Sequence, residues 1–85
     1  MNYSPDDIRV HVTDALRAAL TRPAEIEGST RIVQDLGLDS LAVMNLMMSL
    51  EDHYDVSIPL DRVAEIVTVD DLVKAVVQLT QNERA

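Results

Sequence analysis

The chain has 85 residues and a formal net charge of -8, with 15 acidic and 7 basic side chains. This length fits a single domain, residues 1–85, and the charge repels phosphate backbones and anionic lipid heads, so no nucleic-acid partner is expected. Because cysteine is absent, neither a disulfide framework nor a thiolate metal cage can stabilise the fold. No signal peptide or membrane-spanning apolar run is recognisable, so a cytoplasmic location without membrane insertion is expected.

Residues 5–21 are predicted to form the first helix. Ser4 is suited to be its N-cap, and Pro5 to be its first helical residue. Asp6 and Asp7 then complement the positive end of the helix dipole. Apolar residues recur behind them at helical spacing, at Ile8, Val12, Ala15, Leu16, Ala19 and Leu20.

Residues 22–39 are predicted to form one long loop, because Pro23, Gly28 and Gly37 interrupt any helical pattern. A loop of this length must be partly packed or functional. The apolar residues expected to hold it on the helices are Ile26, Ile32, Val33, Leu36 and Leu38.

Three further helices are predicted, over residues 40–54, 61–66 and 69–80. The second ends before Pro59, since the residue preceding a proline resists the helical conformation. Thr68 is expected to cap the last helix, with Asp71 completing a pair like a capping box. The predicted fold is all-α: a four-helix, up-and-down-type bundle with a short third helix and a long first loop.

Ser40 is the candidate functional residue, because it opens the second helix directly after the loop that contains Gly37. Free backbone N–H groups and the positive end of the helix dipole favour a phosphate ester at this position. Gly37 can adopt the positive φ that the turn into the helix needs. A catalytic serine would need a nearby base, but His53 lies about 20 Å further along the same helix, and no pattern presents His11 to Ser40. Ser40 is therefore interpreted as a residue modified by another enzyme, with a plain helix cap as the alternative.

One stretch resembles the phosphopantetheine attachment motif of the acyl carrier protein family: Asp35-Leu36-Gly37-Leu38-Asp39-Ser40-Leu41. Residues 50–59 resemble the segment that closes the second helix of this family, and the helix order and total length also agree. The resemblance implies that a carrier protein synthase transfers 4'-phosphopantetheine from coenzyme A to Ser40, with the flanking Asp39 involved in recognition by the synthase. The thiol of the arm would hold acyl groups as thioesters for fatty acid, polyketide or related acyl biosynthesis. The chain would then be a carrier and not an enzyme, and no metal site is expected.

The second helix is predicted to carry apolar residues on two opposite sides. Its core side contains Val43, Leu46, Met47, Leu50 and Tyr54. Its outer side contains Leu41, Met44 and Met48, and exposed apolar residues beside a functional serine suggest a protein-docking patch. In the family, acidic residues of this helix meet basic residues of partner enzymes, which implies the same role for two acidic residues here. The predicted partner-binding residues are Leu41, Met44, Asn45, Met48, Glu51 and Asp52.

The chain departs from the usual family pattern at Ala42 and Asn45, where many members carry acidic residues. We hypothesise that its partners rely more on apolar contact than the enzymes of fatty acid synthesis do. The expected partners are the carrier protein synthase and acyl-loading and acyl-processing enzymes with basic or apolar docking patches. The chain itself is expected to be a monomer.

Two alternatives to an acyl carrier stay open. A carrier of aminoacyl or aryl groups in a peptide-assembling pathway would bear the same arm, although such carriers commonly have His where this chain has Asp39. An unmodified helical adaptor would dock through Leu41, Met44 and Met48 alone, and a carrier protein synthase would add no mass to it.

Overall fold

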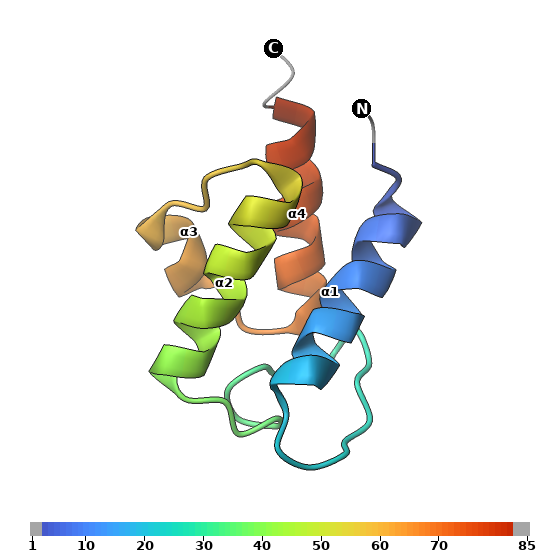
Figure 1. Cartoon of the computed structure of the whole chain (residues 1–85), viewed down its shortest axis with the longest axis vertical. Helices are drawn as coiled ribbons and strands as arrows, with labels where there is room; N and C mark the ends of the chain where they lie inside the picture. The colour runs from blue at the N-terminus through green and yellow to red at the C-terminus, as the bar shows by residue number, and fades with distance from the viewer. Residues whose placement is uncertain (1–2, 83–85) are drawn as a thin grey trace.

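The computed structural model describes residues 3–82, and this part of the chain consists of four α-helices with no strand. Their bounds are α1 Pro5–Ala19, α2 Ser40–Tyr54, α3 Leu60–Glu65 and α4 Val69–Asn82. Helices α1, α2 and α4 run along the length of the molecule, and the short α3 lies on the side away from α1 (Figure 1). The predicted all-α, four-helix fold is confirmed. No helix within the described residues is long and apolar enough to span a membrane.

Helix α1 begins as predicted and ends earlier than predicted. Ser4 is the N-cap, and its Oγ accepts a hydrogen bond of 3.1 Å from the Asp7 N–H. The predicted end at residue 21 was wrong, because Leu20 is already extended. The Leu20 N–H donates a hydrogen bond to the carbonyl of Arg17. Pro23 favours this early end, because it drives the residue before it out of the helical region.

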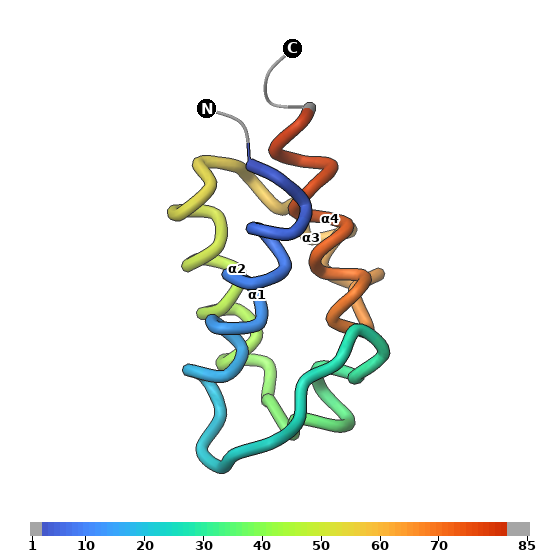
Figure 2. The backbone as a smooth tube through the Cα atoms, turned by 90° about the vertical axis from the view of Figure 1, so that its right-hand side faces the viewer, coloured from blue at the N-terminus to red at the C-terminus, as the bar shows by residue number. Residues whose placement is uncertain are grey.

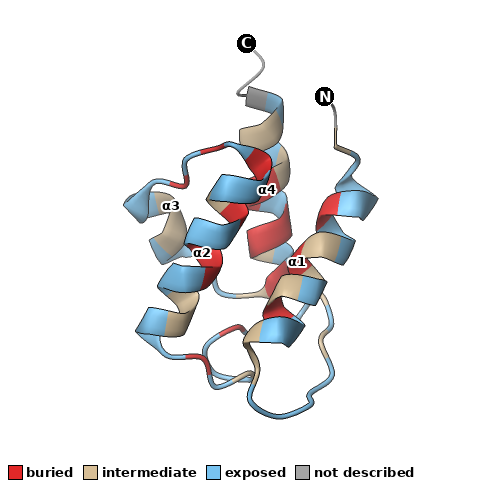
Figure 3. Cartoon of the chain, viewed as in Figure 1, coloured by how far each residue is buried: buried red, intermediate tan, exposed pale blue. Residues whose placement is uncertain are grey.

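The core is built from aliphatic side chains of α1, α2 and α4. Figure 3 shows buried residues, in red, along each of these three helices. The side chains that are fully buried are Ile8, Val12, Leu16, Leu50, Leu72, Val69 and Val76. Among the described residues no polar or charged side chain is buried. Tyr54 closes one end of the core and packs edge-to-face on Tyr3, with ring centroids 4.8 Å apart.

The long loop before α2 is packed on the bundle, as its length required. Ile32 and Leu38 are buried and serve as anchors, whereas Val33 is 54% exposed, so its prediction as an anchor was wrong. Val33 sits on the outside of a tight turn that is closed by hydrogen bonds to the carbonyl of Arg31. The Ile32 N–H also donates to the carbonyl of Val67 at 2.9 Å, which joins the loop to the connection before α4 (Figure 2).

The bounds of the last two helices also differ from the prediction of residues 61–66 and 69–80. Helix α3 starts one residue early, at Leu60, because the carbonyl of Pro59 accepts hydrogen bonds from the first turn and makes Pro59 the N-cap. It also ends one residue early, at Glu65, since Ile66 is already extended. Helix α4 continues two residues further than predicted, to Asn82, and Leu79 packs against the core near this end.

The predicted capping pair at the start of α4 is confirmed. Thr68 Oγ1 accepts a hydrogen bond from the Asp71 N–H at 3.1 Å, and Asp71 Oδ2 accepts one from the Thr68 N–H at 3.0 Å. Backbone hydrogen bonds from Thr68 and Val67 hold the pKa of the Asp71 carboxyl below its ordinary value. This reciprocal pair fixes the point where α4 begins.

Candidate functional site

Ser40 is the first residue of α2, and its side chain is exposed at the end of the bundle where the long loop meets this helix. The N-cap is the preceding residue, Asp39, whose Oδ1 accepts a hydrogen bond of 2.8 Å from the Ala42 N–H. The alternative in which Ser40 serves only as the cap is therefore wrong. Within the described residues the Ser40 hydroxyl has no hydrogen-bond partner.

The backbone around Ser40 offers donors to an anion. Asp39 satisfies the N–H groups of Ala42 and Val43, through its side chain and its carbonyl respectively. The N–H groups of Ser40 and Leu41 have no acceptor in residues 3–82. Helix α2 carries no acidic residue in its first turn, and the carboxylate that meets its positive end within the described residues is that of the N-cap, Asp39. These features fit a phosphate ester on the Ser40 oxygen.

Gly37 shapes the approach to this helix start. Its φ is +69°, in the left-handed region that favours glycine, as the sequence predicted. A Cβ placed on Gly37 would meet nothing within 4 Å, so the backbone conformation and not a lack of space requires glycine. The next residue, Leu38, is buried and fixes the loop directly before Asp39.

Asp35 has a structural role that the sequence did not reveal. Its Oδ2 accepts a hydrogen bond of 2.8 Å from the Arg31 N–H, and its Oδ1 lies 3.2 Å from the Arg31 guanidinium. These hydrogen bonds, with the backbone bond as the larger effect, hold the pKa of the Asp35 carboxyl below its ordinary value. Asp35 thus closes the turn before Gly37.

The outer side of α2 exposes the apolar residues that the helical period placed there. Leu41 is 70% exposed, Met44 46% and Met48 57%, and Asn45 is exposed between them. The opposite side is buried, except that Val43 is only partly covered. Another exposed apolar side chain, Leu60 at the start of α3, was not singled out from the sequence.

The two acidic residues predicted to meet partners differ in their surroundings. Glu51 is partly buried, and its Oε2 accepts a hydrogen bond of 2.7 Å from the Ile58 N–H. This bond supports the loop after α2, where Ile58 is buried. Asp52 is exposed and forms no ion pair within the described residues.

Neither histidine is placed to act as a base for Ser40. His53 lies in the last turn of α2, at the end opposite Ser40. His11 of α1 stacks on it, with ring centroids 3.9 Å apart and an interplanar angle of 14°, and Tyr54 packs edge-on against both rings. Burial, and then the nearby His53, lower the pKa of His11. In residues 3–82 no three His, Asp or Glu side chains gather closely enough to hold a metal ion.

Comparisons with known proteins agree with this geometry. A family model described as the phosphopantetheine attachment site matches residues 10–76. A probable acyl carrier protein of Caulobacter vibrioides is 47% identical over 62 residues, which cover 73% of this chain and 72% of that protein. A putative acyl carrier protein from Mycobacterium tuberculosis superposes with a TM-score of 0.76 at 29% identity, covering 81% of this chain and 93% of that one. The hexanoyl carrier protein from the actinorhodin polyketide synthase of Streptomyces coelicolor gives a TM-score of 0.72 at 27% identity, covering 93% and 92%.

Proposed function

The chain belongs to the acyl carrier protein family, and from this premise we propose that Ser40 is the residue that bears its phosphopantetheine arm. As a member of this family the chain is a carrier and not an enzyme, and phosphopantetheine is its prosthetic group. The observation that carries the assignment is an exposed, unbonded hydroxyl at the first residue of α2, beside the free N–H groups of Ser40 and Leu41. When bound, the arm supplies a thiol that holds acyl groups as thioesters.

In the proposed modification, the Ser40 oxygen forms an ester bond to the phosphorus that carries pantetheine in coenzyme A. The pyrophosphate bond breaks, adenosine 3',5'-bisphosphate leaves, and the hydroxyl proton passes to a base of the synthase. The chain contributes the nucleophilic oxygen and its position. Its own histidines take no part, because His53 lies at the other end of α2 and His11 of α1 stacks on His53.

The assignment is tested by incubating the unmodified protein with a carrier protein synthase, Mg²⁺ and coenzyme A, and then measuring the intact mass. We expect the wild-type chain to gain the mass of one arm and Ser40→Ala to gain none. Ser49→Ala is the matched control, since Ser49 is an exposed serine of the same helix, and it should gain one arm. A gain of mass by Ser40→Ala, or none by the wild type, would refute the assignment.

We propose that partner enzymes dock on the outer side of α2, against Leu41, Met44, Asn45, Met48 and Asp52. The exposure of the three apolar residues supports this, and exposed apolar groups of this kind mark interaction sites. We assign Glu51 to the support of the following loop, because its carboxylate is already hydrogen-bonded to Ile58. Asp52 is then the acidic residue offered to basic groups of a partner.

The docking surface is tested with Met44→Glu. A buried charge at a central contact should weaken the affinity for an acyl-processing enzyme about tenfold. Val10→Glu is the matched control, because Val10 is 62% exposed on α1 and should leave the affinity unchanged. Unchanged binding of Met44→Glu would remove the proposed surface.

We propose that the pathway is polyketide or related acyl biosynthesis and not primary fatty acid synthesis. The absence of acidic residues from the first turn of α2, where Ala42 stands, supports a different set of partners. One similar structure comes from a polyketide synthase. Ketoacyl synthases of the two pathway types should therefore differ in their kcat/KM for the acylated protein, and preference for the fatty acid enzyme would overturn the proposal.

We propose further that residues 1–85 act as one monomeric carrier domain in the cytoplasm, where coenzyme A and the synthase would meet it. Within residues 3–82 the buried apolar residues of α1, α2, α4 and the long loop form one hydrophobic cluster, which supports one domain. Light scattering at the concentration of the docking assay should give the mass of one chain.

A further inference from the structure

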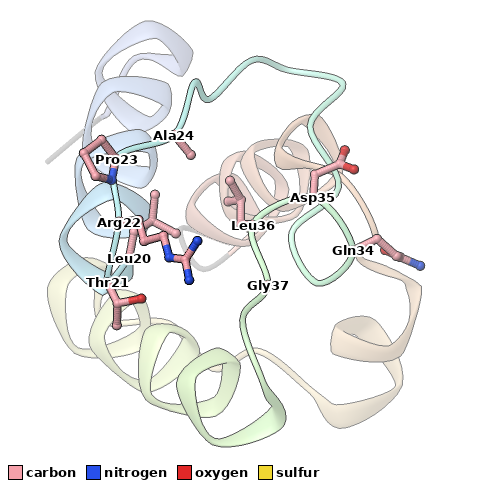
Figure 4. Close-up of a pocket in the computed structure, with 9 residues that line it drawn as sticks. All are labelled: Leu20, Thr21, Arg22, Pro23, Ala24, Gln34, Asp35, Leu36 and Gly37. Carbon is pink, nitrogen blue, oxygen red and sulfur yellow. The ribbon is translucent and has the colours of Figure 1, made fainter.

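A surface cavity of about 470 Å³ lies between the end of α1 and the loop that leads into α2 (Figure 4). Residues 20–24 form one wall, and residues 34–37 form the other. The apolar base includes Leu20 and Leu36, which are half-buried and pack against the core. The cavity lies away from the proposed docking residues of α2, and none of them lines it.

The polar groups in this cavity favour an anion. In Figure 4 the Arg22 guanidinium and the Thr21 hydroxyl point into the space beside Gly37, whereas the Asp35 carboxylate and the Gln34 amide turn away from it. Both Asp35 oxygens are held by Arg31. An anion in the cavity would therefore face the Arg22 guanidinium and the Thr21 hydroxyl. The Asp35 carboxylate would repel it little, because its charge is compensated by Arg31.

Arg22 is distinguished from other arginines by its lack of a partner. In the described part of the chain three arginines form ion pairs with aspartates: Arg9 with Asp70, Arg17 with Asp14, and Arg31 with Asp35. Arg22 is exposed and has no carboxylate at ion-pair distance within residues 3–82. Arg62 also forms no ion pair there, but its guanidinium donates a hydrogen bond of 2.7 Å to Gln78 Oε1. Among the arginines of residues 3–82, Arg22 is therefore the one with neither an ion pair nor a side-chain hydrogen bond.

The cavity is within reach of a group carried on Ser40. Gly37 precedes Ser40 by three residues, so their Cα atoms are at most about 11 Å apart. A phosphopantetheine arm is longer than this when extended, so its free end can turn back past Gly37. The space directly beside Gly37 is open, because apart from its chain neighbours nothing lies within 4 Å of the position that a Cβ on Gly37 would take.

We propose that the arm carries a short dicarboxylic acid, bound as a thioester through one of its two carboxyl groups. The cavity then binds the other carboxyl group, which is free and negatively charged. The inference rests on the proposed attachment at Ser40. The Arg22 guanidinium can hold a carboxylate through two parallel N–H···O hydrogen bonds, which an uncharged acyl group of similar size cannot accept. The tether raises the effective concentration of the carboxylate, so a partly exposed cation suffices. The phosphodiester of the arm is fixed at Ser40 and is common to all acyl forms.

The test compares the malonyl and acetyl forms of the protein, which differ by one carboxylate. Both are made with the carrier protein synthase from malonyl- or acetyl-coenzyme A, and intact mass verifies each load. In ¹H–¹⁵N spectra, the Arg22 side-chain Nε–H and the Gly37 amide should shift between the two forms. Free malonate, added to the acetyl form at an equal concentration, should leave both signals in place.

Two variants separate a specific contact from a general effect of charge. In Arg22→Gln the Gly37 amide should no longer distinguish the malonyl from the acetyl form. In Arg17→Gln, which removes a guanidinium paired with Asp14 on α1, the difference should persist. Identical signals in the two acyl forms, a difference that survives Arg22→Gln, or an equal shift with free malonate would overturn the inference. A failure of the Ser40 assignment is seen separately, as a missing arm in the mass spectrum, and would overturn it as well.

Discussion

Asp39 and Ser40 are adjacent residues with separate tasks at the start of α2. The Asp39 carboxylate satisfies the Ala42 N–H and so fixes the helix start, which leaves the Ser40 hydroxyl without an internal partner. If Ser40 were the cap, its oxygen would be engaged by the helix and less available for modification. The resemblance to the family suggested that the synthase recognises Asp39. The structure adds a local role as N-cap, which a substitution that removes the capping oxygen would also disturb.

Two substitutions of Asp39 separate these roles. Asp39→Ala should lower the free energy of unfolding by about 1 kcal/mol, because the cap is lost. Asp39→Asn should leave the free energy of unfolding nearly unchanged, since Asn is as good an N-cap as Asp. It removes the negative charge that the synthase is expected to recognise. Urea unfolding measures the first effect, and kcat/KM for arm transfer measures the second. Arm transfer to Asp39→Asn at the wild-type rate would show that the charge is not recognised.

For single residues, the sequence predicted those roles that depend on neighbours within one turn of the chain. It did not predict contacts between residues that are far apart in the sequence. The positive φ of Gly37 and the pairing of Thr68 with Asp71 follow from residues within one turn, and both could be predicted. Gly28 is different: a Cβ there would approach Asp70 to 2.5 Å, and no local pattern links two residues so far apart. The hydrogen bond from Ile58 to Glu51 was missed for a related reason, because it depends on how the loop after α2 folds back.

At the level of elements, α1 and α2 meet through the stacked rings of His11 and His53. The spacing of residues along α1 and α2 did not predict this contact between His11 and His53, because it depends on how the two helices pack together. Tyr54 borders both rings, and Tyr3 packs on Tyr54. Asp14 favours protonation of His11, but burial and His53 oppose it more strongly, so the pKa of His11 is lowered from 6.5.

This contact predicts a loss of stability in mild acid. The unfolded chain takes up a proton at His11 near its ordinary pKa of about 6.5, whereas the folded chain resists it, so the unfolded state binds more protons as the pH falls. The free energy of unfolding should therefore decrease from about pH 7.5 to pH 5.5, within the range where histidine titrates. Urea unfolding across this range, monitored by circular dichroism, measures the effect.

Two variants assign the acid effect to the histidine pair. His11→Gln should flatten the pH dependence, and His53→Gln should flatten it in part, because it removes the neighbouring charge but not the burial. The lowered pKa values of Asp35 and Asp71 act at lower pH, below the ordinary carboxyl value of 3.8, so they do not mask this effect. If His11→Gln kept the wild-type slope, the acid sensitivity would have another origin.

For the whole molecule, the arrangement of the four helices was predictable because apolar spacing, caps and breakers agree along the chain. The helix ends were less predictable: α1 ends at Ala19, shortly before Pro23, and α4 continues past its predicted end to Asn82. The net charge of -8 acts on the molecule as a whole, because its extents are 38 × 24 × 19 Å. At about 0.01 M salt the Debye length is about 30 Å, comparable to the molecule, and at about 0.1 M it is about 10 Å. Repulsion between distant carboxylates is therefore largely removed over this range.

Added salt should accordingly stabilise the carrier. The opposing effect is the screening of three ion pairs, but their side chains are 42–67% exposed, and such pairs contribute at most about 1 kcal/mol each. The urea midpoint should rise between about 0.01 M and 0.1 M NaCl. A triple variant, Glu25→Gln, Asp52→Asn and Glu65→Gln, removes exposed carboxylates that form no ion pair within residues 3–82, and its midpoint should rise less. A midpoint that falls with salt would show that the ion pairs outweigh the repulsion.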